Sequence, residues 1–414
     1  MSRRLAGLRD GLASGLILSG LILAGAAAAN PAEPPPLPRV GDAVLEPVVY
    51  ERLPGWTRDA QSTALAVFRR TCAAPRLRPV AAEAPRGAPS QEIGPACRAA
   101  EAVPAGHGAA RAFFETWFDA WRVVRPGPSG EPARTEGFLT GYFEPEVAGS
   151  LERSADFSVP LLARPDDLVP LEPGDPRPPG LDPGLRAARR GADGVLTAYP
   201  DRAAIEDGAL AERARPIVWL RDAVDVLVIQ VQGSGRVRLP DGRVLRLAYD
   251  GRNGQPYASV ARLIVAEGAL PLEGLTLARW TGWLRANPEA GRRLMRRNAS
   301  YIFFRVDDAL APEDGPVGAA GVPMATGRGL AVDAALWRYG LPVWLAGTLP
   351  TTEGGTAPLA RLTIAQDTGS AIVGAARGAL FLGNGEAAGV RAGLTRQAVA
   401  FVVLLPRREP RPLP

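Results

Sequence analysis

The chain of 414 residues contains no lysine, one histidine and two cysteines, and each scarcity removes a class of chemistry. Without lysine there is no amine nucleophile on a side chain, and every permanent side-chain cation is an arginine. His107 stands alone in a Gly/Ala-rich segment, which excludes multi-histidine metal centres and leaves histidine-dependent triads one poor candidate. Two cysteines with no histidine nearby make a poor zinc site. We therefore expect no metal and no cofactor.

Charge of one sign is not in strong excess. The formal net charge of +5 results from 48 basic and 43 acidic residues, and the arginines are scattered along the chain. A nucleic-acid-binding protein needs its basic residues concentrated on one surface, so this pattern does not predict a nucleic-acid partner. A mild basic excess is compatible with an anionic polymer.

The N-terminus has one apolar run, and it is short. Three arginines in the first nine residues precede an apolar run at 16–24, and small residues follow at 25–29. This arrangement is typical of a secretory signal peptide, and the run is shorter than the ~20 residues of a membrane span. We predict a signal peptide at 1–29 that is cleaved, a flexible leader at 30–44 and a periplasmic location, with no lipoprotein cysteine near the cut. The alternative is an uncleaved N-terminal anchor. In an oxidising compartment, Cys72 and Cys97 should form a disulfide.

Hydrophobic periodicity predicts a mainly β fold with helices. Helical patterns occupy 60–72, 109–124, 257–268 and 276–297, and Pro288 should begin a separate helix within the last of these. The β patterns are expected from 137 onward, at 224–231 as a buried strand, at 236–249 as a hairpin, and at 331–345, 359–365, 379–382 and 398–405.

The most informative segment places one acidic side chain in a loop of small residues. The strand-like run 359–364 is followed by Ala365-Gln366-Asp367-Thr368-Gly369-Ser370. Glycines at 369 and 374 allow a ligand to approach the backbone, so Asp367 is able to meet a substrate. Two chemistries use such a loop, which are glycan cleavage on a double-psi β-barrel and aspartic proteolysis.

Aspartic proteolysis needs two carboxylates that share a proton, and therefore two Asp-Thr/Ser-Gly loops in each active site. This chain has one such tripeptide, at 367–369. A homodimer could supply the second loop, but the other motifs of the chain have no place in that account. The protease remains the minor alternative.

Several glycine-flanked motifs supply hydroxyl, amide and aromatic groups but no metal ligands. This combination favours a sugar polymer over phosphate or metal as the ligand. Each group could equally be structural, since Tyr142 could pack in a core and Gly233-Ser234 could form a turn. The candidate substrate-binding residues are Thr140, Tyr142, Glu144, Gln232, Gly233, Ser234 and Tyr257.

Eight motifs occur in the order found in one known family. They are Thr-Gly-Tyr-Phe-Glu-Pro-Glu at 140–146, Tyr-Pro-Asp-Arg at 199–202, Ile-Gln-Val-Gln-Gly-Ser-Gly at 229–235, Asn-Gly-Gln-Pro-Tyr at 253–257, Ser-Tyr-Ile-Phe-Phe-Arg at 300–305, Gly-Val-Pro at 321–323, Leu-Ala-Val-Asp at 330–333 and Ala-Gln-Asp-Thr-Gly-Ser-Ala-Ile at 365–372. From 137 to its end, the chain thus resembles the membrane-bound lytic murein transglycosylase A family.

The resemblance implies a double-psi β-barrel built from both chain ends, with a smaller β domain inserted and a glycan groove where they meet. We assign 45–138 and 257–408 to the barrel domain and 139–256 to the insert. The resemblance also implies that the partner is the glycan strand of peptidoglycan. The implied reaction breaks the β-1,4 bond between N-acetylmuramic acid and N-acetylglucosamine without water and leaves a 1,6-anhydromuramic end.

The chain departs from the family pattern where the general acid is expected. The family carries a catalytic aspartate about twelve residues after the aspartate of Asp-Thr-Gly, and this chain has Ala379 there. Val373 and Ala387 also replace residues that are usually charged. Asp333 and Asp367 remain and are the candidate catalytic residues. Either one of them takes over as the acid, or the groove binds glycan without cutting it; we expect position 379 to face that groove.

Overall fold

The computed structural model describes residues 36–74, 90–127, 131–171 and 175–410. The predicted signal peptide at 1–29 and the beginning of the leader lie outside these residues. Within the described ranges, no helix is both long enough and apolar enough to cross a membrane.

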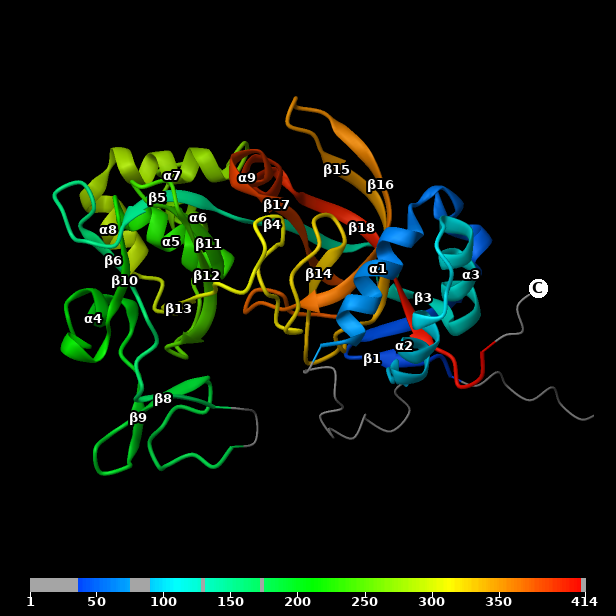
Figure 1. The fold of residues 1–414 in the computed structure, drawn as a ribbon, viewed down its shortest axis with the longest axis horizontal. Coiled ribbons are helices and arrows are strands. Elements are labelled where there is room, and N and C mark those ends of the chain that lie inside the picture. The colour runs from blue at the N-terminus through cyan, green and yellow to red at the C-terminus, as the bar shows by residue number, and fades with distance from the viewer. Residues whose placement is uncertain (1–35, 75–89, 128–130, 172–174, 411–414) are drawn as a thin grey trace, which may run out of the picture. The chain divides into compact units, whose positions relative to one another are not determined.

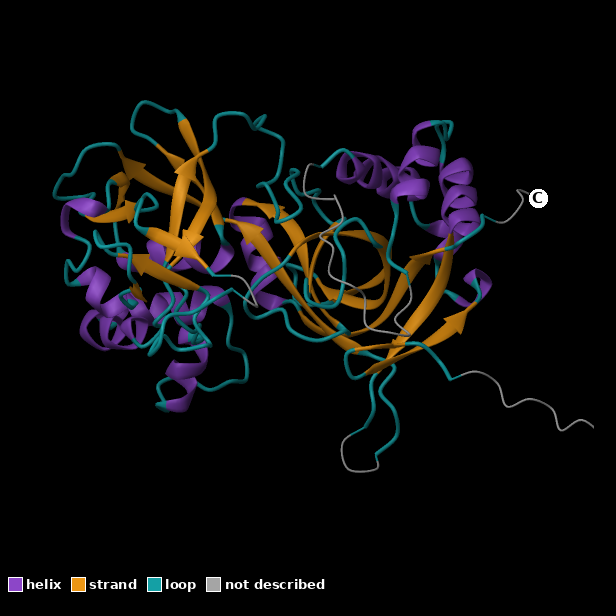
Figure 2. Ribbon diagram, turned by 90° about the horizontal axis from the view of Figure 1, so that it is seen from below, coloured by secondary structure: helices purple, strands orange, loops and turns teal. Residues whose placement is uncertain are grey.

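Six strands form a closed barrel (Figure 1), and Figure 2 looks into its ring. The strands are β4 (Gly137–Glu144), β14 (Gly329–Val332), β15 (Pro342–Pro350), β16 (Thr356–Asp367), β17 (Arg377–Asn384) and β18 (Arg396–Pro406). Their order is β18-β15-β16-β14-β17-β4, and β4 pairs back with β18 to close the ring. Two pairs, β14–β16 and β17–β4, are parallel, while the other neighbours are antiparallel. The mainly β prediction, with a barrel built from both ends of the chain, is confirmed.

The chain before the barrel extends this sheet and adds three helices. Strands β1 (Arg39–Val40), β2 (Ala43–Val48) and β3 (Phe118–Val124) continue outward from β18, and two 3₁₀ turns, η1 (Tyr50–Arg52) and η2 (Trp56–Arg58), follow β2. The helices are α1 (Gln61–Cys72), α2 (Gly94–Glu101) and α3 (His107–Trp117). A disulfide joins Cys72 to Cys97, as predicted, and ties α1 to α2.

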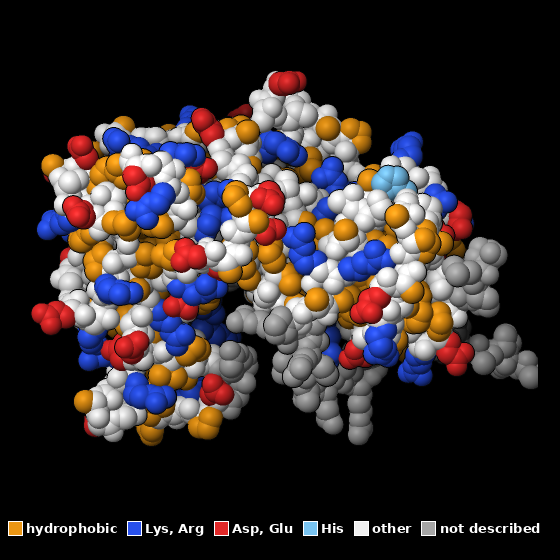
Figure 3. Space-filling view, in the orientation of Figure 1, with side chains coloured by type: hydrophobic (Ala, Val, Ile, Leu, Met, Phe, Trp, Pro, Cys, Tyr) orange, Lys and Arg blue, Asp and Glu red, His pale blue; other side chains and the backbone are white. Residues whose placement is uncertain are grey.

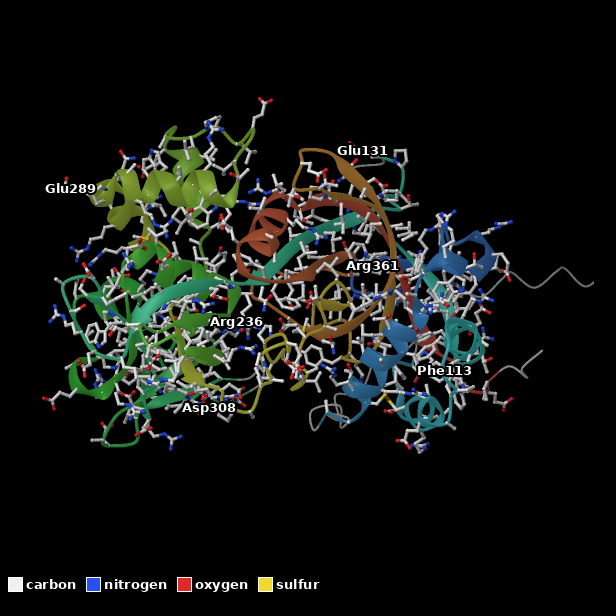
Figure 4. The ribbon with its side chains drawn as sticks, turned by 45° about the horizontal axis from the view of Figure 1, so that its top comes forward. Phe113, Glu131, Arg236, Glu289, Asp308 and Arg361 are labelled. Carbon is white, nitrogen blue, oxygen red and sulfur yellow. A yellow bond between two sulfur atoms is a disulfide. The ribbon has the colours of Figure 1, made fainter. Side chains whose placement is uncertain are left out.

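The predicted helix at 109–124 is wrong in its second half. Helix α3 ends at Trp117, and β3 begins at Phe118 and pairs with β2 and β18. Aromatic residues at 113, 114, 117, 118 and 121 fit one face of a helix. The change from helical to strand periodicity after Trp117 therefore leaves no mark in the hydrophobic pattern. Phe113 (labelled in Figure 4) and Phe118 nevertheless meet in one aromatic cluster, with ring centroids 6.2 Å apart.

A second sheet contains six strands in the order β13-β12-β11-β5-β10-β6. They are β5 (Glu146–Ser150), β6 (Val159–Leu162), β10 (Pro216–Leu220), β11 (Ser234–Arg238), β12 (Val244–Arg252) and β13 (Ile302–Val306). Five of these strands come from the segment assigned to the insert, and β13 comes from later in the chain. The hairpin predicted at 236–249 is confirmed as β11–β12. A bridge between Ala163 and Phe304 brings the two edge strands together.

A small third sheet and several helices complete the fold. The sheet contains β7 (Leu168–Pro170), β8 (Ala187–Arg190) and β9 (Leu196–Ala198), and a 3₁₀ turn, η5, covers Ala211–Arg213. The helices are α4 (Arg202–Glu206), α5 (Ala223–Gln232), α6 (Val260–Ala266), α7 (Leu277–Ala286), α8 (Pro288–Arg296) and α9 (Gly385–Leu394). The helical patterns after 257 are confirmed, and Pro288 begins α8 as predicted.

The predicted buried strand at 224–231 is wrong, because these residues form helix α5. The Asp222 carboxylate accepts a hydrogen bond from the Asp225 amide at 2.8 Å and caps the helix, and Gly233 ends it with a φ of +80°. A short, continuously apolar run has no period that separates strand from helix. The run is apolar all round because α5 packs against two cores, with Leu227 in the first and Ile229 in the second.

Candidate functional site

Asp367 ends β16 and begins a row of residues that crosses four neighbouring strands. Ala331 of β14 is in register with Asp367 on one side and with Ala379 of β17 on the other, and Ala379 is in register with Thr140 of β4. Neighbouring strands lie about 4.8 Å apart, so Asp367 and residue 379 are separated by roughly 10 Å. The barrel therefore brings together Thr140, Asp367 and the expected acid position.

The Asp367 carboxylate is held on both oxygens. Oδ1 accepts a hydrogen bond from the Ala319 amide at 2.9 Å, and Oδ2 accepts one from the Tyr142 hydroxyl at 2.9 Å. Burial raises the pKa of the Asp367 carboxyl above its ordinary value, although hydrogen bonds from Ala319, Thr368 and Tyr142 oppose this effect. The group therefore keeps its proton to a higher pH than an exposed aspartate does, which suits a general acid.

Tyr142 is the partner that links β4 to this carboxylate. Burial, and then the negative charge of Asp367, raise the pKa of the Tyr142 hydroxyl well above its ordinary value. Tyr142 consequently remains a hydrogen-bond donor at any pH near neutrality. Its ring contacts that of Phe381 on β17, with centroids 5.4 Å apart, and this contact fixes the position of the hydroxyl.

Position 379 is buried rather than open to a groove. The Ala379 side chain is 5% exposed and forms a small apolar cluster with Ala331 and Ile372, against which Tyr142 packs. The methyl group cannot donate a proton, so the barrel presents Asp367 as the one carboxyl of this row.

Asp333 follows β14 and holds the neighbouring loop. Its Oδ2 accepts a hydrogen bond from the Gly374 amide at 2.7 Å, and its Oδ1 accepts one from the Ala335 amide at 3.0 Å. Gly374 has a φ of +110°, a conformation that favours glycine, so the contact fixes a backbone turn that few other residues could adopt. Val373, just before it, is 72% exposed. These contacts fix the backbone of the loop at 374.

Glu144 lies in a buried ion cluster. Its side chain is 1% exposed and accepts hydrogen bonds from Arg236 at 2.7 Å and from Arg246 at 3.3 Å. Arg236, labelled in Figure 4, also donates to the carbonyl oxygens of Pro312 and Asp314. The cluster joins β4 to the second sheet, and a glycan could contact Glu144 only if this cluster opened.

The remaining candidate binding residues are spread over two regions. Gln232 accepts a hydrogen bond from the Phe143 amide at 3.2 Å, one residue from Tyr142, while Gly233 ends α5 and Ser234 begins β11 as a buried residue. These three residues lie close to β4. Tyr257 is 40% exposed before α6, and none of the hydrogen bonds of the described residues connects it to Asp367.

Two contributors escaped the sequence analysis. The Ala319 amide binds Asp367, and a backbone donor leaves no signal in side-chain chemistry. Arg252 of β12 donates to the Ser370 hydroxyl at 2.8 Å and so reaches the loop after Asp367 from 118 residues away. A Gly-Arg-Asn-Gly motif marks Arg252, but nothing in the sequence indicates that it contacts this loop.

No metal-binding group of side chains is evident in the part of the chain that the structure describes. No group of three or more His, Cys, Asp or Glu side chains is arranged to hold a metal ion among those residues. Figure 3 shows acidic and basic side chains interspersed over the face in view. The site chemistry is therefore that of a carboxyl, a phenol and backbone amides.

Comparisons with known proteins agree with the fold. Residues 138–305 match the family model of the MltA specific insert domain, and residues 328–405 match the 3D domain. A membrane-bound lytic murein transglycosylase from Agrobacterium tumefaciens is similar in structure, with a TM-score of 0.73 and 32% identity over 88% of this chain and 98% of that one. MltA from Neisseria gonorrhoeae gives a TM-score of 0.71 and 30% identity over 92% of this chain and 100% of that one.

The alignment with a curated relative covers a smaller part of both sequences. Membrane-bound lytic murein transglycosylase A of Vibrio cholerae is 33% identical over 198 residues, which are 47% of this chain and 52% of that protein. The chain thus spans about half the length of this curated relative.

Proposed function

Because this chain belongs to the membrane-bound lytic murein transglycosylase A family, we propose that it cleaves peptidoglycan as a lytic transglycosylase. The bond is the β-1,4 link between N-acetylmuramic acid and N-acetylglucosamine, and the product carries a 1,6-anhydromuramic end. The observation that supports this function best is a half-buried aspartate, Asp367, at the end of a barrel strand, whose carboxyl has a raised pKa.

One carboxyl is sufficient for this reaction. The protonated Asp367 gives its proton to the glycosidic oxygen while the anomeric C–O bond breaks with oxocarbenium character. The resulting carboxylate then takes the proton of the sugar's own primary hydroxyl as that oxygen bonds to the anomeric carbon. The acid is restored, and no water is consumed. Each carboxyl oxygen has a second lone pair, so either can carry the proton while Tyr142 and Ala319 stay bound.

Two residues outside the row hold the acid and its loop in place. Tyr142 fixes Oδ2 of Asp367, and Asp333 fixes the loop that leads back into β17. Asp333 accepts hydrogen bonds from the backbone amides of Ala335 and Gly374, and we assign it the role of positioning this loop. The glycan would reach Asp367 beside Thr140, which is partly exposed in the same row.

The alanine at position 379 favours a second candidate function, which is glycan binding without cleavage. Alanine at the family's acid position, within a buried apolar cluster, also fits a protein that binds glycan strands and leaves them intact. An aspartic protease is less well supported, because the groups that hold Asp367 are Tyr142 and the amides of Ala319 and Thr368 rather than a second carboxylate.

The site of action follows from the substrate. We propose that the segment 1–29 directs export and is removed, so that the protein meets peptidoglycan in the periplasm.

The experiment is incubation of purified mature protein with peptidoglycan, followed by mass spectrometry of the products. Wild type should release 1,6-anhydromuropeptides, Asp367→Asn should release none, and Asp193→Asn, in an exposed turn, should match wild type. Products with reducing ends would contradict the transglycosylase. Sedimentation with sacculi and no release would support the binding protein, and failure to sediment at moderate salt would contradict both.

A further inference from the structure

A cavity of about 490 Å³ lies in the second sheet, where β6, β10, β12 and β13 meet. Its floor is apolar and includes Phe304, which is fully buried, and Ile217. Its charged lining consists of three arginines and one carboxylate, which are Arg164, Arg215, Arg305 and Asp250. The cavity therefore combines an apolar base with an excess of positive charge.

Much of this charge has no partner among the residues that the structure describes. Arg164 gives one N–H to the Leu168 carbonyl, and Arg305 pairs with Asp307 at 3.1 Å. The side chains of Arg215 and Asp250 make no hydrogen bond or ion pair with any described residue. Each guanidinium carries five N–H donors, so most donors around the cavity remain free to bind anionic oxygens.

Strand β12 connects the cavity with the candidate catalytic loop. Asp250 lies two residues from Arg252 along β12, a distance of roughly 7 Å in a strand. Arg252 donates to Ser370, which is three residues beyond Asp367. A ligand that occupies the row beside Asp367 could thus place a substituent at this cavity.

We propose that the cavity is a subsite for the peptide that muramic acid carries in peptidoglycan. This inference rests on the proposed function. The peptide bears carboxylates and a free amine, and the cavity offers guanidinium groups to the former and the Asp250 carboxylate to the latter. The site would select peptide-bearing glycan over stripped strands, because a guanidinium–carboxylate pair gains both charge and hydrogen bonding.

The test compares binding of two glycan ligands by calorimetry, and every protein in it, including the one called wild type here, carries Asp367→Asn so that neither ligand is cleaved. One is a muropeptide tetrasaccharide with its peptides, and the other is the same tetrasaccharide after an amidase has removed them. Wild type should bind the peptide-bearing form about tenfold more tightly, the gain expected from one or two charge-assisted pairs. The double variant Arg215→Gln/Arg305→Gln should bind both forms with the affinity that wild type has for the stripped form.

A matched control variant removes the charge of an arginine that lies outside the cavity. Arg243→Gln removes one arginine from the exposed hairpin turn, where it pairs with Asp241, and should retain the full preference. Circular dichroism should show that all variants are folded, as expected because Arg215 and Arg305 are exposed.

A second measurement tests Asp250 separately. Acetylation of the free amine of the peptide should weaken binding to wild type severalfold, whereas Asp250→Asn should bind the acetylated and free forms equally.

Three results would overturn the assignment. They are equal affinity of wild type for both tetrasaccharides, a preference that survives in the double variant, and competition by inorganic phosphate at matched ionic strength that equals competition by the free peptide. Failure of either tetrasaccharide to bind would instead contradict the proposed function itself.

Discussion

Tyr142 and Asp367 are 225 residues apart in the chain, and their side chains share a hydrogen bond of 2.9 Å across the barrel sheet. The strands that carry them, β4 and β16, are separated by β17 and β14. The Tyr142 ring packs against the cluster of Ala331, Ile372 and Ala379, so the tyrosine connects the cluster at the expected acid position with the surviving aspartate. The chain thus combines a small residue at 379 with a hydrogen bond from Tyr142 to the Asp367 carboxyl.

Tyr142→Phe should move the pH dependence of catalysis to higher pH. The Tyr142 hydrogen bond favours the carboxylate of Asp367, so its removal raises the pKa of that acid further. The rate, which falls as Asp367 ionises, should then fall at a higher pH than in wild type. The free energy of unfolding should decrease by about 1 kcal/mol. Release of anhydromuropeptides against pH measures the first effect and urea unfolding the second.

Tyr199→Phe is the matched control for this prediction. The Tyr199 hydroxyl donates to Asp167 at 2.9 Å, which is the same kind of contact at the same distance, but away from the barrel. The control should lose similar stability and keep the wild-type pH profile. A profile that moves in both variants would show that general loosening, rather than the Asp367 contact, is responsible.

Asp367→Asn should stabilise the protein relative to wild type increasingly as the pH rises. Burial raises the pKa of Asp367 above its unfolded value, near 3.9, so the folded state binds the proton more tightly. Wild type loses this advantage as the pH rises from the unfolded pKa through the folded one, at no more than about 1.4 kcal/mol per pH unit. The asparagine variant has no such dependence. Urea unfolding at several pH values from 4 to 8 tests this, and a constant difference between the two proteins would contradict it.

The sequence predicted much of the fold because local patterns and ordered motifs agree. The β11–β12 hairpin has alternating residues and a Pro-Asp-Gly turn, and Pro288 begins α8 as its fixed φ allows. The misread segments are those in which burial on several sides removes the alternation. Helix α5 contacts two cores, and β3 carries aromatic residues that continue the stripe of α3.

The sequence predicts those residues of the site whose side chains belong to recognisable motifs, but not the contacts between them. Asp367 and Tyr142 lie in recognisable motifs, but their contact depends on register across four strands, which the sequence does not encode locally. Glu144 has the appearance of a binding residue, and only the structure shows Arg236 and Arg246 around it. The Ala319 amide has no side-chain signature at all.

Glu144→Gln should destabilise the fold by about 3 kcal/mol or more, since it leaves two buried arginines without a counter-charge. Glu146→Gln is the matched control two residues along the chain, because Glu146 pairs with Arg238 at the surface. It should cost less than about 1 kcal/mol. Urea unfolding compares the two variants, and equal losses would contradict the structural role of Glu144.

Ala379→Asp tests whether the family's acid can be restored. The new carboxyl would lie in the cluster of Ala331 and Ile372, so its pKa should be raised by burial and it should hold a proton near neutral pH. Burying a polar group there without a hydrogen-bond partner should cost roughly 1–3 kcal/mol of stability, because the group loses its hydration.

General acid catalysis contributes about 10²- to 10⁴-fold in rate, and a misplaced acid contributes less. We therefore expect Ala379→Asp to raise anhydromuropeptide release by roughly tenfold, a partial rescue because Val373 and Ala387 also differ from the family pattern. Ala331→Asp is the control, since it places a carboxyl in the same cluster, at 3% exposure, but on the neighbouring strand. It should lose similar stability and gain no activity. If Ala379→Asp folds, binds glycan and releases no more product than wild type, residue 379 does not occupy the position of the acid.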